Sequence, residues 1–189
     1  LFCGGITGGN PFVINNIKPT DRVGVIGIGG LGHMALQFAN AWGCEVTAFS
    51  SSSDKKEEAL ELGAHRFVSS KDPKEVAAIA NSLDMILVTI NVPLDWQPFL
   101  AALRAKGKLH FVGAVPEIKV PFFPMLSGQK SVGASPLGSP ATLAKMLEFC
   151  ARHEISPMVE EMPMSEINEA FTRLEEGKPR YRIVLKNDL

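Results

Sequence analysis

The sequence is poor in cysteine and has no excess of charge of either sign. Only three cysteines occur, Cys3, Cys44 and Cys150, and none forms a C-x-x-C pair, which excludes a secreted disulfide scaffold and favours a reducing compartment. Nineteen basic residues face 20 acidic ones, so the chain lacks the basic field that binds a nucleic-acid backbone. It also lacks an apolar run of about 18 residues that could cross a bilayer. We therefore expect a cytoplasmic protein that binds neither nucleic acid nor membrane.

The first residues lack two further features. Leu1-Phe2-Cys3-Gly4-Gly5 contains neither an initiating methionine nor the basic leader of a signal peptide. We expect the sequence to be an excised part of a longer protein. Hydrophobic residues make up 46% and charged residues 21% of the 189, a composition typical of one globular domain, or of one domain with an appended segment.

Short apolar runs alternate with amphipathic stretches along most of the chain. We expect strands at 22–28, 44–49, 66–68, 84–90, 108–112 and 130–135, separated by helices at 31–42, 54–62, 72–81, 94–104 and 139–150, with a proline-bounded loop at 116–124. Strands joined by helices of about ten residues pair in parallel through right-handed crossovers. The sequence therefore predicts an α/β fold with a doubly wound parallel sheet of the Rossmann type.

The pattern changes near residue 140. The run 158–162, a helix at 165–175 and the run 181–185 do not continue the winding. We therefore divide the chain into a dinucleotide-binding domain, 1–140, and a C-terminal segment, 141–189.

A glycine cluster follows the first strand. Gly27-Ile28-Gly29-Gly30-Leu31-Gly32 matches G-x-G-x-x-G between a strand and a helix. In that setting the glycines permit a tight turn, close approach of a pyrophosphate and helix–strand packing, and the helix N-terminus faces the phosphates. A turn that serves packing alone is the alternative, and we favour dinucleotide binding.

The end of the second strand indicates which dinucleotide binds. An acidic residue about 20 positions beyond the glycine turn would select NAD, but here Ser50-Ser51-Ser52-Ser53 and Lys55 follow. Hydroxyl groups and an ammonium group suit a 2′-phosphate, so we expect NADP(H) in preference to NAD(H). Alternatively, Ser53 or Asp54 merely caps the next helix and the lysines are solvated.

Several segments together resemble one family. They are Cys3-Gly4-Gly5-Ile6-Thr7, GIGGLGHM at 27–34, VTAFSSSSDKKEEAL at 46–60, KGKLHFVG at 106–113, MLEFC at 146–150 and Arg180-Tyr181-Arg182. This set resembles the zinc-dependent alcohol dehydrogenases of the medium-chain dehydrogenase/reductase superfamily, in particular the cinnamyl alcohol dehydrogenase branch, over nearly the whole chain.

The resemblance implies NADP(H)-linked, zinc-assisted interconversion of primary alcohols and aldehydes. It assigns the following roles: a zinc ligand to Cys3; the nicotinamide surroundings to Thr7, Leu31, Val112, Gly113 and Ala114; the pyrophosphate to Arg182; and the 2′-phosphate pocket to Ser50, Ser51, Ser52 and Lys55. It also implies a homodimer in which the edge strand 130–135 pairs between subunits.

The chain departs from the family in two ways. The family has a tyrosine or another bulky residue shortly after the threonine, whereas this chain has Gly8-Gly9-Asn10. A complete member also carries about 150 residues before Cys3, with the GroES-like substrate domain and the other zinc ligands. A catalytic zinc needs three protein ligands, and this chain supplies one, so we expect it to bind the cofactor without turnover.

The sequence also indicates the surroundings of the histidines, of the other two cysteines and of several apolar residues. The four histidines, His33, His65, His110 and His153, have no ligand spacing, and we expect each to be packed or on the surface. Cys44 and Cys150 should be small core residues. The apolar residues Met158, Val159, Met162 and Phe171 should be exposed without a substrate domain, so we expect the isolated chain to self-associate.

Two alternatives remain open. The same fold serves zinc-free quinone and enoyl reductases, and a dinucleotide-sensing module would bind the nucleotide without chemistry. The identity of the alcohol or aldehyde lies beyond these residues.

Overall fold

A computed structural model describes residues 1–188. Its main sheet has six strands in the order β3-β2-β1-β4-β5-β6, and every neighbouring pair is parallel. The strands are β1 (Arg22–Ile26), β2 (Glu45–Ser50), β3 (Arg66–Ser69), β4 (Leu83–Val88), β5 (Leu103–Phe111) and β6 (Ser131–Ala134). The predicted doubly wound parallel sheet is confirmed.

The order of the strands creates a switch point between β1 and β4. From β1 the chain winds one way through β2 and β3, and from β4 it winds the other way through β5 and β6. The loops that follow β1 and β4 therefore diverge and leave a crevice at the carboxyl ends of these strands, where ligands bind in this architecture.

Helices connect the strands close to where the sequence pattern predicts them, but β5 begins at Leu103, inside the helix expected at 94–104. The helices are α2 (Gly32–Trp42), α3 (Lys56–Glu61) after a 3-10 turn at Ser53–Lys55, α4 (Pro73–Ala77) and α5 (Gln97–Ala102). The Asp72 side chain accepts a hydrogen bond from the Lys74 backbone N–H at 2.8 Å and so caps α4. Gly43 ends α2 in the left-handed conformation, with φ of 97°.

Both faces of the sheet are buried. Alternate residues of β4 point to opposite sides, so Met85 and Leu87 join one core cluster while Ile86 and Val88 join the other. This burial explains why the strands read as continuous apolar runs and not as alternating ones.

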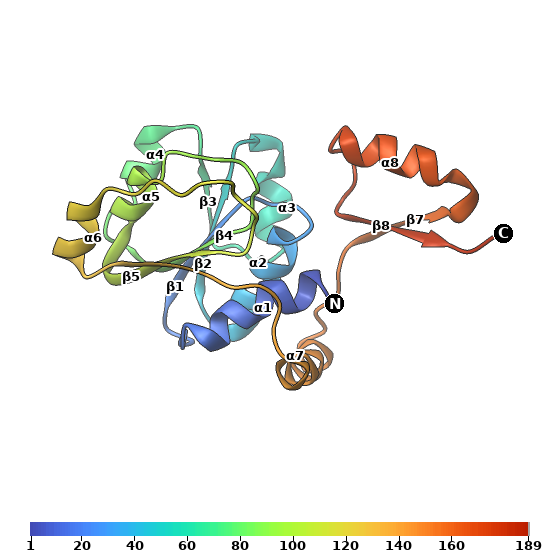
Figure 1. The fold of residues 1–189 in the computed structure, drawn as a ribbon, viewed down its shortest axis with the longest axis horizontal. Helices are drawn as coiled ribbons and strands as arrows, with labels where there is room; N and C mark the ends of the chain where they lie inside the picture. Colours follow the sequence, from blue (N-terminus) through green and yellow to red (C-terminus); the bar gives the residue numbers. More distant parts are fainter. Residues whose placement is uncertain (189) are drawn as a thin grey trace.

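Two helices lie where the sequence gave no helical signal. α1 (Gly4–Ile14) contains four glycines and Pro11, and α6 (Phe122–Gly128) corrects the expectation of a loop through residue 124. In α1, residues 5 to 12 are all buried, and the helix packs against α2 and α7 (Pro140–Arg152) (Figure 1). A Cβ at Gly8 would lie 3.4 Å from the backbone nitrogen of Ala35, so close packing outweighs the low helix propensity of glycine.

The C-terminal part contains a second sheet. β7 (Val159–Pro163) and β8 (Arg182–Lys186) pair in parallel, with α8 (Ile167–Glu175) between them, and Figure 1 shows them beside the main body. Met158, Val159 and Phe171 are exposed as expected, whereas Met162 is half-buried. Met146 and Cys150 of α7 belong to the core of the main body, and the division at residue 140 stays a prediction.

No helix within residues 1–188 combines the length and the apolar character that a membrane span requires.

Candidate functional site

A cavity of about 370 Å³ lies in the crevice at the switch point. It brings together most of the residues that the sequence assigned to the nucleotide: Gly27, Gly29, Gly30, Leu31, Ser50, Ser51, Ser52 and Lys55. The glycine turn and the serine run meet because β1 and β2 are adjacent parallel strands whose carboxyl ends lie at the same edge.

The glycine turn has the geometry of a phosphate cradle. Gly27 has a φ of +91°, and a Cβ at Gly32 would lie 1.8 Å from the carbonyl oxygen of Gly27, so neither position has room for a side chain. A Cβ at Gly29 would meet no atom within 4 Å. The backbone at Gly29 is therefore open to the cavity beside the N-terminus of α2, where a pyrophosphate is stabilised.

Thr89 holds the glycine turn from the adjacent strand end, a role that the sequence analysis missed. Its hydroxyl oxygen lies 3.0 Å from the carbonyl oxygen of Ile26 and 2.9 Å from that of Gly27. The hydroxyl can donate to either carbonyl and so fixes the turn to the end of β4. No sequence motif marks this threonine, because its role depends on β1 and β4 being neighbours.

The Lys55 side chain lines the crevice cavity and reaches the glycine turn. Its ammonium group donates a hydrogen bond to the carbonyl oxygen of Ile28 at 2.7 Å and lies 5.6 Å from the centre of the Tyr181 ring. Burial, followed by the nearby Arg180 charge, lowers the pKa of Lys55. The ammonium group thus stands between the glycine turn and the serine run.

The serine run is ordered by local hydrogen bonds. The Ser52 backbone N–H donates to the Ser50 hydroxyl oxygen at 3.2 Å, and the Ser52 hydroxyl donates to the Asp54 carboxylate. This second bond holds the pKa of Asp54 below its usual value. Asp54 is therefore a charged neighbour of the predicted phosphate pocket.

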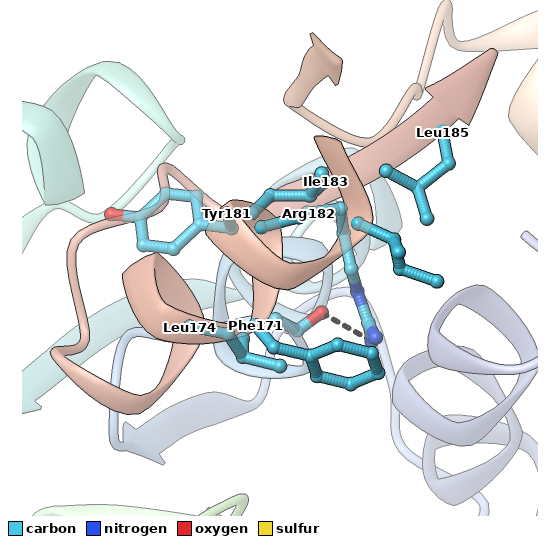
Figure 2. A pocket seen from close by; sticks show the side chains of 9 residues that line it. Phe171, Leu174, Tyr181, Arg182, Ile183 and Leu185 are labelled. Atoms are coloured by element: carbon cyan, nitrogen blue, oxygen red, sulfur yellow. Dashed lines mark hydrogen bonds between the residues drawn. The ribbon is translucent and has the colours of Figure 1, made fainter. Parts of the chain in front are cut away.

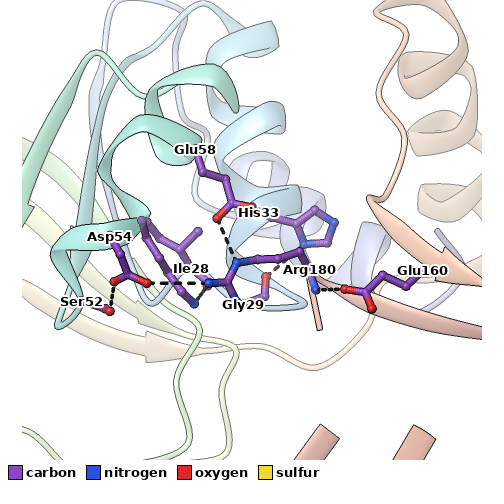
Figure 3. Close-up of polar contacts among 9 residues, drawn as sticks. Ile28, Gly29, His33, Ser52, Asp54, Glu58, Glu160 and Arg180 are labelled. Atoms are coloured by element: carbon purple, nitrogen blue, oxygen red, sulfur yellow. Dashed lines mark hydrogen bonds and ion pairs between the residues drawn. The ribbon is translucent and has the colours of Figure 1, made fainter. Parts of the chain in front are cut away.

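Arg180 reaches this acidic neighbour from the C-terminal part of the chain (Figure 3). Its guanidinium lies 3.8 Å from the carboxylate of Asp54 and 3.3 Å from that of Glu58, while its backbone N–H donates to Glu160 at 2.7 Å. Arg180 thus offsets the negative charge near the serine run. The sequence analysis noted Arg180 only within the Arg-Tyr-Arg run and gave it no role.

Arg182 lies against the outer side of the glycine turn. Its guanidinium donates a hydrogen bond to the carbonyl oxygen of Gly30 at 3.0 Å, and the side chain forms one wall of a second cavity, of about 360 Å³. Figure 2 shows Phe171, Leu174, Ile183 and Leu185 around this cavity. Arg182 is therefore next to the predicted pyrophosphate position, although it does not line the crevice cavity itself.

His33 connects the glycine turn to the segment before β7. Its Nδ1 lies 3.0 Å from the Gly29 carbonyl oxygen, and its Nε2 accepts a hydrogen bond from the Met158 backbone N–H at 3.3 Å. Nδ1 must then carry the proton of a neutral ring. Burial lowers the pKa of His33, and the ring stacks on Tyr181 with centroids 4.7 Å apart.

Of the five predicted nicotinamide residues, Leu31 lines the crevice cavity, whereas Thr7, Val112, Gly113 and Ala114 do not. Thr7 is buried in α1, and Ala114 is exposed beyond β5. The backbone N–H groups of Val112 and Gly113 both donate to the Val88 carbonyl. A Cβ at Gly113 would lie 1.9 Å from the Ile90 carbonyl oxygen, which accounts for the glycine by packing. The nicotinamide roles assigned to these residues stay predictions.

The described residues do not form a zinc site by themselves. Cys3 is exposed, and no three histidine, cysteine, aspartate or glutamate side chains within residues 1–188 are grouped to hold a metal ion. Cys44 and Cys150 are buried, and burial raises the pKa of Cys44 to about 12.

The remaining histidines also have structural surroundings. His110 is buried between Asn15 and Ser135, whereas His65 and His153 lie on the surface. One candidate ligand, Cys3, is fewer than the three that a catalytic zinc requires.

Comparison with known proteins places these features in a family context. Residues 30–152 match the family model described as zinc-binding dehydrogenase. The chain is 53% identical to the aldehyde reductase AdhA of Synechocystis over 99% of its own length and 56% of that protein. It is 40% identical to cinnamyl alcohol dehydrogenase 2 of Rauvolfia serpentina, over 98% of the chain and 52% of that protein.

Two solved structures show the same fold. Cinnamyl alcohol dehydrogenase SbCAD4 from Sorghum bicolor superposes with a TM-score of 0.92 at 38% identity, over 97% of this chain and 53% of that one. The Helicobacter pylori cinnamyl alcohol dehydrogenase, complexed with NADP(H), gives a TM-score of 0.84 at 32% identity, over 97% and 52% of the two chains. The chain thus spans about half the length of the relatives that it matches.

Proposed function

The chain belongs to the zinc-binding dehydrogenase family, and from this premise we propose that it forms the NADP(H)-binding part of an alcohol dehydrogenase or aldehyde reductase. In such an enzyme the bound nicotinamide accepts a hydride from a primary alcohol or returns one to an aldehyde. The proposal rests above all on one observation: a single cavity joins the open glycine turn, three serines and Lys55.

In this proposal, different residues in and beside the cavity bind the pyrophosphate and the 2′-phosphate of the cofactor. The turn at Gly29 and the N-terminus of α2 receive the pyrophosphate, and Arg182 adds a positive charge at the Gly30 side of the turn. Ser50, Ser51 and Ser52 offer hydroxyl groups to the 2′-phosphate, and Lys55 and Arg180 supply the positive charge. The Helicobacter relative complexed with NADP(H) supports this choice of cofactor.

The proposal assigns no metal chemistry to residues 1–188. Cys3 is the single candidate zinc ligand among residues 1–188, and residues outside the described chain must complete a metal site. We therefore propose no step through zinc for these residues alone, and we expect the 189-residue chain to bind the cofactor without turnover.

The proposal also includes a homodimer. β6 is one of the two edge strands of the main sheet, opposite β3, and Phe122, Phe123 and Leu126 of the neighbouring α6 are exposed. An unpaired strand edge beside apolar side chains favours pairing with a second copy.

The thermal midpoint of the chain with NADPH, with NADH and without nucleotide tests the cofactor assignment. Ligand at 100 times its dissociation constant adds about 2.7 kcal/mol to the free energy of unfolding, which for a domain of this size corresponds to roughly 5–10 °C. We expect the larger shift with NADPH. A larger shift with NADH would refute the phosphate pocket, and no shift with either would refute nucleotide binding by this chain.

A further inference from the structure

A third cavity, of about 310 Å³, lies between α1, α2 and α7. It shares no lining residue with the crevice cavity. Its lining is aromatic and aliphatic, including Phe38, Trp42, Met146 and Phe149. A cavity of this size is at the small end of ligand pockets, about 300–1,000 Å³.

Gly9 of α1 is one of the residues that line the cavity. A Cβ at Gly9 would lie 3.3 Å from Cε1 of Phe38 and 3.5 Å from Cγ of Met146. A bulky side chain there would occupy the space between α1, α2 and α7. Because Gly9 has no side chain, this space stays open in the chain.

The walls of the cavity are fixed before any ligand binds. The Trp42 indole N–H donates to the Ile17 carbonyl oxygen at 2.9 Å, and the Trp42 and Phe149 ring centroids lie 5.4 Å apart. The Phe149 ring also stacks on Phe38, with centroids 6.1 Å apart. A preformed pocket loses little conformational entropy on binding.

Two polar groups of this cavity have no partner in the described part of the chain. The Asn10 side chain is only 7% exposed, lines the cavity and makes no hydrogen bond within residues 1–188. The amide atoms of Asn10 are not among the fully buried polar atoms without a partner in the described chain, so they remain open to a ligand in the cavity that Asn10 lines. Lys145 lines the cavity from the exposed side of α7, has no ion-pair partner among the described residues and is the one charged side chain in the lining.

We propose that this cavity binds a small anionic amphiphile, a short-chain aliphatic carboxylate. The apolar chain packs among the aromatic rings, and the carboxylate lies at the mouth beside Lys145, within reach of the Asn10 amide. One water molecule occupies about 30 Å³ in the liquid. If each non-hydrogen atom of a ligand needs a similar volume, a cavity of about 310 Å³ holds about ten such atoms, which is the size of octanoate.

Trp42 supplies the readout. The chain has two tryptophans, and Trp96 is 1% exposed in the other core cluster, so a ligand in this cavity changes the fluorescence of Trp42. We expect a saturable change with octanoate, a weaker one with octan-1-ol and none with acetate. NADPH should leave octanoate binding unchanged, because the two cavities share no residue. Displacement of octanoate by NADPH would overturn the proposal.

Substitutions at exposed positions of α7 test the location without disturbing the core. Ala141→Phe fills the cavity mouth and should abolish the octanoate response, whereas Ala144→Phe, on the same helix but outside the lining, should not. Lys145→Gln should weaken octanoate by roughly two- to fivefold, the range for an exposed ion pair, and leave octan-1-ol unchanged. No saturable octanoate response in the unsubstituted chain, or one that survives Ala141→Phe, would refute the site.

Discussion

Arg182 and Gly30 are 152 positions apart in the sequence, yet the guanidinium of one donates a hydrogen bond to the carbonyl oxygen of the other at 3.0 Å. This bond brings a positive charge from β8 to the glycine turn (Figure 2). The C-terminal strand β8 therefore contacts the glycine turn, which we propose as part of the nucleotide site.

Replacing Arg182 by alanine should weaken the binding of NADPH and of NADH to a similar degree. The guanidinium contacts the glycine turn, which we propose to bind the pyrophosphate that both nucleotides share, and a hydrogen bond to a charged group contributes about 1.5–3 kcal/mol. We expect a loss of affinity of about ten- to a hundredfold for each nucleotide, measured by calorimetric titration. A loss confined to NADPH would show that Arg182 contacts the 2′-phosphate instead.

Lys55→Ala should lower the affinity for NADPH more than the affinity for NADH. The ammonium group lies between the turn and the serine run, so its removal takes a charge-assisted bond from the 2′-phosphate and leaves NADH nearly unchanged. We expect the preference for NADPH to fall about tenfold. Lys56→Ala, in the adjacent exposed position, is the matched control. Equal losses for both nucleotides with Lys55→Ala would argue that the lysine only supports the turn.

Two alanine substitutions in the glycine turn should separate stability from binding. Gly32→Ala places a Cβ 1.8 Å from the Gly27 carbonyl oxygen, so we expect the free energy of unfolding to fall by about 1–3 kcal/mol or more. Gly29→Ala places its Cβ in open space and should weaken the nucleotide while the thermal midpoint of the free chain hardly changes. A large loss of stability in Gly29→Ala would contradict the open cradle.

The free energy of unfolding should depend on pH through His33. Burial sets the folded pKa of His33 below its ordinary value of 6.5, so between these values the unfolded chain binds a proton that the folded chain does not. Stability should therefore decrease as the pH falls through this window and become independent of this group below the folded pKa. His110, whose pKa burial also lowers, acts in the same direction.

The variant His33→Gln, followed by urea unfolding at several pH values, checks this assignment. Its pH dependence should be shallower than that of the unsubstituted chain, and the part that His110 contributes should remain. An unchanged slope would show that His33 is not the group responsible.

The exposed face of α8 should cause self-association. Phe171 and Leu174 are 57% and 58% exposed. Burial of such neighbouring apolar side chains against another molecule is favourable, so they promote association. Light scattering at high concentration should give a mass above that of a monomer, and Phe171→Ser combined with Leu174→Ser should lower it. Phe123→Ser tests the edge beside β6 separately. A monomer at every concentration would contradict both surfaces.

Local sequence patterns predicted the main sheet because its central strands β1, β2 and β4 are buried along nearly their whole length and each crossover is short. The same patterns failed for α1, where four glycines and Pro11 give no helical signal. That helix forms because residues 5 to 12 are buried between neighbouring helices, which is information that only the assembled fold contains. α6 was missed for a related reason, since Pro121 and Pro124 flank its first turn and suggested a loop.

The grouping of residues in the crevice cavity, our proposed nucleotide site, was predictable where these residues form motifs. The glycine turn and the serine run lie in short segments, and the strand order then brings them together. Thr89, Arg180 and His33 were missed because each acts across the fold, through a carbonyl oxygen, a carboxylate or a backbone N–H group far away in the sequence. A titratable or hydroxyl side chain with a distant partner leaves no local pattern.

The small sheet of β7 and β8 has a consequence for the order in which parts of the chain open. A two-stranded sheet is barely stable alone, so these strands should exchange their amide hydrogens with solvent sooner than β1 and β4 do. Arg182 lies on this more weakly held part. A nucleotide that engages Arg182 would therefore slow hydrogen exchange in β7 and β8, and the most labile region of the chain would report that the pocket is filled.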